Sequence, residues 1–127
     1  TKGSLMMIFV SSAIMFALLA LYGYTTNTNL DSLGKILIFG LLAIIITSII
    51  NIFINSSGLD ITLSIVSVVL FLGLTAYDMQ KLKSIYSYYQ SDSNMLEKSA
   101  IYGALNLYLD FINIFLELLN LFGKRND

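Results

Sequence analysis

The 127-residue chain has no cysteine, no histidine, no proline and no tryptophan, and only 12% of its residues are charged. The lack of Cys and His excludes a Cys/His zinc site, a Cys or His nucleophile and a histidine pH switch within this chain. A soluble domain carries about twice this fraction of charged residues. Seven basic and eight acidic residues give a net charge of −1. We therefore expect no nucleic-acid partner.

Apolar residues are what the chain has in quantity, at 57% of the sequence, and they gather in four long stretches. These run from about Leu5 to Tyr24, Ile36 to Ile54, Ile61 to Tyr77 and Ala100 to Phe122. Each approaches the roughly 20 residues that a helix needs to cross a membrane, and none alternates as membrane strands do. The sequence therefore predicts an all-α, polytopic membrane protein, with residues 1–127 as one transmembrane domain of about four helices.

The first residue is Thr1 rather than Met, directly before a membrane segment. We therefore interpret the chain as the C-terminal part of a longer protein. Its expected partners are membrane lipid and the N-terminal helices of the same protein.

The fourth stretch carries a stripe of less apolar residues, spaced 3, 4, 3, 4 and 3 apart: Gly103, Asn106, Asp110, Asn113, Glu117 and Asn120. On a helix, this spacing places them along one face. A carboxylate in lipid costs about 2.5–3.5 kcal/mol on insertion scales, so Asp110 should face protein or a water-filled cavity. Asn106, Asn113 and Glu117 are candidate pore-lining residues. The asparagines are also explained as hydrogen-bonding groups between helices, and Glu117 as a residue near the far interface.

A second acid, Asp78, follows the third apolar stretch. We expect the third helix to continue to about Tyr88 and the fourth to begin near Ser99, joined by a short loop. Asp78 and Asp110 would then both lie about 15–17 Å below the loop, at nearly equal depth. The sequence therefore predicts that the two carboxyls meet. The alternative is that Asp78, close to Lys81, is an ordinary interfacial acid.

Two carboxylates that meet in a low-dielectric site cannot both ionise cheaply, so they share a proton and titrate as a unit. Carboxylate oxygens also suit Ca²⁺. Asp78 and Asp110 are therefore a candidate pH sensor and a candidate Ca²⁺ site, and we expect no other cofactor. An intramembrane aspartyl protease also needs two acids. Asp110 lies in LYLD, without the Gly-x-Gly-Asp motif of that class, so we expect no enzyme.

Three segments carry a resemblance to a known family: LALYGYTTNTNLDSLG, TAYDMQKL and ALNLYLDFINIFLELLNLFG. Together they resemble the C-terminal part of the Bax inhibitor-1 family, the transmembrane Bax inhibitor motif proteins, from about Met6 to Gly123. The resemblance implies a seven-helix membrane protein with its last helix at the centre, of which this chain holds about four helices. It also implies a paired-aspartate site that matches Asp78 and Asp110. The family pairs these acids with an arginine on an early helix, which has no counterpart here, and Glu117 occupies a position expected to be uncharged.

Members of this family are linked to a pH-gated calcium leak and, in eukaryotes, to suppression of cell death. The resemblance therefore implies a pH-sensitive calcium leak channel or transporter. The alternative is an interaction or scaffold protein that modulates cell death or stress through other membrane proteins, without ion transport of its own. The Asn- and Ile-rich, compact sequence is typical of bacteria, so we expect a multi-pass protein of the bacterial plasma membrane.

Overall fold

The computed structural model describes residues 2–126, with side chains for residues 2–123. It contains α1 (Lys2–Thr25), α2 (Asp31–Ile54), α3 (Ser57–Tyr88) and α4 (Ser93–Asn126). All four helices are long and apolar enough to cross a membrane, and residues 2–126 include no strand. The predicted all-α, polytopic membrane fold is confirmed.

The turn between α2 and α3 is short because both helix ends are capped locally. Asn55 adopts the left-handed conformation, with φ 58° and ψ 47°, and its N–H donates to the Asn51 carbonyl. The Ser56 hydroxyl then accepts a hydrogen bond from the Leu59 N–H, at 3.2 Å, and begins α3. Left-handed Asn at a helix end and Ser at a helix start are common capping choices.

The loop between α3 and α4 is shorter than the sequence predicts. α3 does continue to Tyr88, as expected, but α4 begins at Ser93, six residues before the predicted start at Ser99. Asp92 accounts for the early start, because its carboxylate accepts a hydrogen bond from the Met95 N–H at 3.2 Å and caps the helix.

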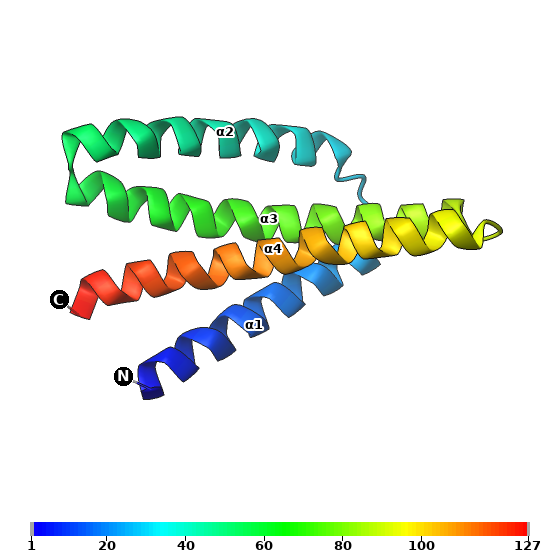
Figure 1. Cartoon of the computed structure of the whole chain (residues 1–127), viewed down its shortest axis with the longest axis horizontal. Helices are drawn as coiled ribbons and strands as arrows, with labels where there is room; N and C mark the ends of the chain where they lie inside the picture. Colours follow the sequence, from blue (N-terminus) through cyan, green and yellow to red (C-terminus); the bar gives the residue numbers. More distant parts are fainter. Residues whose placement is uncertain (1, 127) are drawn as a thin grey trace.

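The helices pack around α3, as Figure 1 shows. α3 contacts each of the other three helices, α1 also contacts α4, and within the described chain α2 contacts α3 alone. Both chain ends lie at the same end of the bundle. A central last helix is a prediction for a seven-helix protein, and it stays a prediction.

Four phenylalanines join α1 to α4. Phe111 makes edge-to-face contacts with Phe9 and Phe16, with ring centroids 5.6 and 5.5 Å apart, and Phe115 contacts Phe9 at 5.8 Å. Such pairs contribute about 0.5–1.5 kcal/mol each beyond their buried area. The contacts hold α1 against α4 directly beside Asp110.

α1 and α3 approach each other backbone to backbone at Gly23. A Cβ added there would lie 2.7 Å from the Ala76 carbonyl carbon and 2.8 Å from its Cα, and it would also meet the carbonyl oxygen. Small residues allow this close approach, which is typical of helix pairs in membranes. The contact fixes α1 against the part of α3 that carries Asp78.

Candidate functional site

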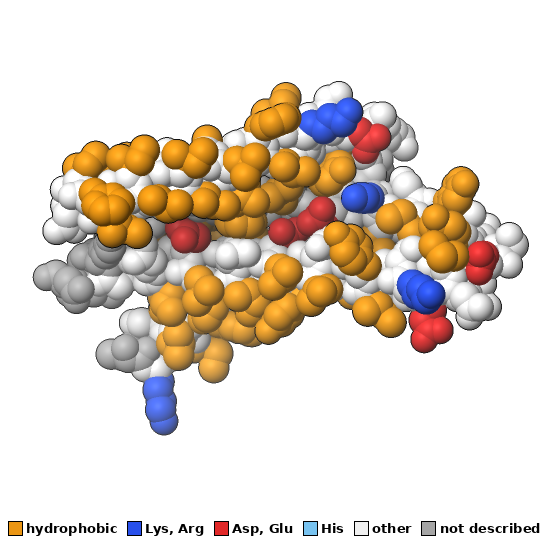
Figure 2. Space-filling view, turned by 45° about the horizontal axis from the view of Figure 1, so that its top comes forward, with side chains coloured by type: hydrophobic (Ala, Val, Ile, Leu, Met, Phe, Trp, Pro, Cys, Tyr) orange, Lys and Arg blue, Asp and Glu red, His pale blue; other side chains and the backbone are white. Residues whose placement is uncertain are grey.

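The carboxyl groups of Asp78 and Asp110 lie within hydrogen-bonding reach of each other across the seam between α3 and α4. A hydrogen bond between two carboxyls requires a proton on one of them. Figure 2 shows acidic side chains in a seam between two apolar surfaces. The structure thus brings together the two acids that the depth argument paired.

Asp110 is the more enclosed of the two acids. Asp110 is 6% exposed, whereas Asp78 is half-buried. The Oδ2 atom of Asp110 is buried and has no hydrogen-bond partner among the described residues. A buried acceptor without a partner is costly. The Asp110 carboxyl therefore has capacity for a proton, a water molecule or a cation.

The acids meet even though α4 begins earlier than predicted, because contacts on both sides of them set the register of the two helices. On the loop side, a Cβ at Gly103 would lie 3.2 Å from Cγ of Leu82. On the other side, the Asn120 amide donates to the Ser64 hydroxyl at 2.8 Å. Asp110 lies between these two contacts.

A small pocket of about 10 Å³ opens beside Asp78, and Lys81, Tyr102 and Asn106 also line it. This volume holds about one water molecule. Lys81 is the one cationic side chain among the pocket's lining residues. The pocket therefore places Asn106, one helical turn before Asp110, next to the acidic pair.

The predicted stripe is only partly the buried face of α4. Gly103 and Asp110 are buried, Glu117 is half-buried and Asn120 is exposed, while Leu118 is buried in its place. Each residue turns an α-helix by about 100°, so the 17 residues from Gly103 to Asn120 fall about 100° short of five full turns. The stripe therefore turns toward the edge of the contact with α3 at its C-terminal end, where Asn120 is exposed but still donates to Ser64 of α3.

The other stripe residues form different contacts. Glu117 hydrogen-bonds Ser64, the same hydroxyl that accepts from Asn120. The Asn113 amide donates to the Leu109 carbonyl of its own helix at 2.8 Å. Asn106 and Glu117 therefore face the seam with α3, and the Asn113 amide is held by its own backbone.

The sequence reasoning missed the role of Gln80, two residues after Asp78. Its side-chain oxygen accepts from the Leu30 N–H at 2.9 Å, and its amide donates to the Thr28 carbonyl at 2.6 Å. Lys83 adds a 2.8 Å bond to the Tyr24 carbonyl. These side chains tie the α1–α2 loop to the helix that carries Asp78. The only signal in the sequence is a glutamine, with its long side-chain amide, three residues after the apolar run ends at Tyr77.

Comparison with known proteins gives a family match over residues 1–127, to the family described as "Inhibitor of apoptosis-promoting Bax1". A protein of Borreliella burgdorferi is 45% identical over 127 residues, which are 100% of this chain and 55% of that protein. The inner membrane protein YbhL of Escherichia coli K12 is 44% identical over 126 residues, which are 98% of this chain and 54% of YbhL. The chain spans about half the length of the curated relatives it matches.

Proposed function

The chain is a multi-pass bacterial membrane protein of the Bax inhibitor-1 family, and we propose that it forms part of a calcium leak channel gated by pH through Asp78 and Asp110. The observation that carries the proposal is the contact between the two carboxyls in the α3–α4 seam. Placing an acidic side chain inside the membrane costs free energy, so such a residue is a functional candidate by default.

The gating argument rests on the charge of the pair. With one shared proton, a hydrogen bond between the carboxyls joins α3 to α4. When both groups are ionised, they repel each other at short range and attract a cation, which favours opening of the seam. Acidification neutralises the pair and weakens cation binding. We therefore expect calcium flux to fall as the pH is lowered from 8 to 6.

Calcium is the proposed ion because it is a hard cation that prefers oxygen ligands. Two carboxyl groups offer fewer oxygens than the roughly six to eight that Ca²⁺ takes, so the ion would keep part of its water shell. Weak binding suits conduction, since an ion must leave its site as readily as it enters. Asn106, Asn113 and Glu117 are the residues proposed to line the path along α4.

The test is calcium flux into liposomes that contain the complete protein, measured between pH 6 and pH 8. Asp78→Asn and Asp110→Asn should each weaken the pH response strongly, because one remaining acid has no second carboxyl with which to share a proton or repel. Glu97→Gln is the matched control, since Glu97 is an exposed acid on α4 outside the seam. It should keep the wild-type response.

Two results would reject the proposal. One is a wild-type flux that does not change between pH 6 and pH 8. The other is a pair of aspartate variants whose flux follows pH as closely as that of the Glu97→Gln control.

A further inference from the structure

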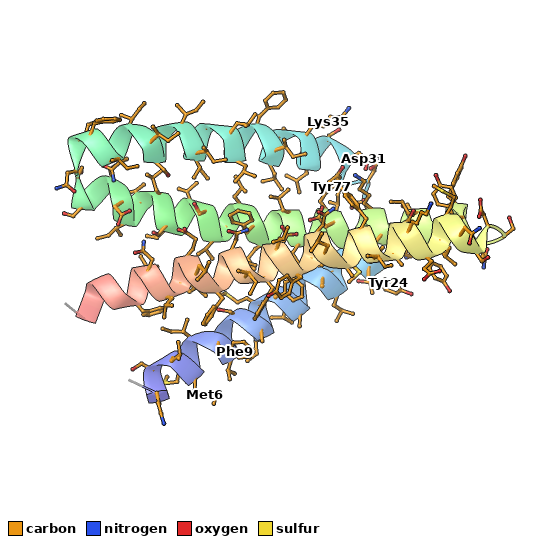
Figure 3. All side chains as sticks on the ribbon, in the orientation of Figure 1. Met6, Phe9, Tyr24, Asp31, Lys35 and Tyr77 are labelled. Carbon is orange, nitrogen blue, oxygen red and sulfur yellow. The ribbon has the colours of Figure 1, made fainter. Side chains whose placement is uncertain are left out.

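A groove of about 1150 Å³ lies between the α1–α2 loop and the end of α3. Asp31 and Lys35 of α2 line it, together with Tyr77, Lys81 and Lys83 of α3. Figure 3 shows Asp31, Lys35 and Tyr77 close together where α2 begins beside α3. The groove is large enough for a small-molecule ligand.

Positive charge dominates the groove. Three of its lining residues are lysines and one is an acid, which gives a net charge of +2. Lys83 already has partners, because its ammonium donates to the Tyr24 carbonyl and lies 4.8 Å from the centre of the Tyr24 ring. Lys35 and Lys81 are exposed. The Lys81 ammonium lies 6.0 Å from the centre of the Tyr77 ring, and among residues 2–123 neither lysine forms an ion pair. A cation over a ring keeps its hydrogen-bond donors free, so both ammonium groups can still contact an anion.

The position of the groove along the helices indicates the source of that anion. The apolar part of α2 starts at Ile36, directly after Lys35, and the apolar run of α3 ends at Tyr77. The groove therefore lies where the membrane-crossing parts of two helices end. Tyrosine is enriched at this level of a membrane, and lysine side chains extend their charge into the headgroup layer.

We propose that this groove binds the phosphate group of an anionic membrane lipid, with Lys35 and Lys81 as the side chains that contact the phosphate oxygens. A net charge of +2 favours a lipid with net negative charge over a zwitterionic lipid, whose own ammonium would be repelled. Lys83 also lines the groove and joins α3 to α1 through its bond to the Tyr24 carbonyl. The inference does not rest on ion conduction, because neither Asp78 nor Asp110 takes part in it; Lys81 also lines the small pocket beside Asp78.

The test is native mass spectrometry of the delipidated, complete protein in detergent, titrated with phosphatidylglycerol or phosphatidylcholine. Each lysine near an anionic lipid contributes about fivefold in affinity, so the double variant Lys35→Gln/Lys81→Gln should bind phosphatidylglycerol about 25-fold more weakly. Its binding of phosphatidylcholine should not change. The control Lys2→Gln/Lys98→Gln removes the same charge outside the groove and should stay within about threefold of wild type.

Three further measurements separate the effect of charge from that of folding, and binding of the lipid from binding of soluble phosphate. Lys35→Arg/Lys81→Arg keeps the charge and should retain binding, and the single Gln variants should each lose about fivefold. Glycerol phosphate should compete only at far higher concentration than the lipid. Equal losses in the groove and control variants, unchanged binding in the groove variant, or competition by glycerol phosphate at lipid-like concentration would each overturn the proposal.

Discussion

Replacing Gly23 by alanine should force α1 away from α3. The added Cβ would lie 2.7 Å from the carbonyl carbon of Ala76, and ordinary contact begins at 3.4 Å, so the helices must separate by at least 0.7 Å (3.4 minus 2.7). The atoms in the way belong to a helix backbone and cannot rotate aside. Overpacking of this kind costs about 1–3 kcal/mol, and the rigid neighbour favours the upper value.

Alanine also favours the helix by at most about 1 kcal/mol over glycine, so the net loss of stability for Gly23→Ala is about 2 kcal/mol. For a protein of about 200 residues this lowers the midpoint of thermal unfolding by about 4–8 °C. The assay is the fraction of detergent-solubilised protein that stays monodisperse after heating. Gly3→Ala is the control in the same helix, because nothing lies within 4 Å of a Cβ there, and it should not lower the midpoint.

A second variant tests the cause. Because the clash involves backbone atoms of residue 76, Ala76→Gly removes none of them and should not rescue Gly23→Ala. Rescue by Ala76→Gly, or a midpoint for Gly23→Ala equal to that of Gly3→Ala, would refute the backbone-contact argument.

Two further predictions concern hydrogen bonds between elements. Gln80→Ala removes both bonds to the α1–α2 loop and should destabilise the protein by about 2 kcal/mol in the same heating assay, whereas Gln90→Ala, at an exposed position, should have little effect. Ser64→Ala removes the hydroxyl that bonds both the Asn120 amide and Glu117 and should cost at least about 1 kcal/mol, with the exposed Ser87→Ala as its control. Equal midpoints for either variant and its control would contradict the assigned bonds.

Much of the fold is predictable because the constraint of the membrane acts on each segment separately. A stretch of about 20 apolar residues must be a helix in lipid, since its backbone polar groups have no other partners. The helix ends were less predictable. The start of α4 depends on a cap by Asp92, and the long apolar pattern used to place the helix does not include that residue.

The burial of the polar stripe residues on α4 could not be predicted from their spacing alone. The spacing placed Asp110 and Asn120 on one face, and both contact α3, yet Asp110 is buried whereas Asn120 is exposed. The five spacings between stripe residues average less than the roughly 3.6 residues of one helical turn. Each step therefore rotates the next residue slightly around the helix axis, and the rotation adds up along the stripe. Gln80 was missed for another reason, because its partners Thr28 and Leu30 are about 50 residues away and become neighbours only when α1 and α2 fold back on α3.

The sequence determined that Asp78 and Asp110 lie within long apolar helices, but residue counting did not place them at equal depth, because α4 begins at Ser93: Asp110 lies 17 residues from the loop (110 minus 93) and Asp78 only 10 (88 minus 78). The sequence also could not decide whether the two carboxyls face each other. That depends on the rotation of each helix about its own axis, and contacts between distant residues set it, among them the close approach of Gly103 to Leu82 and the bond from Asn120 to Ser64. Helix formation in lipid is a local property of the sequence, whereas the register and the rotation of the helices are properties of the packed bundle.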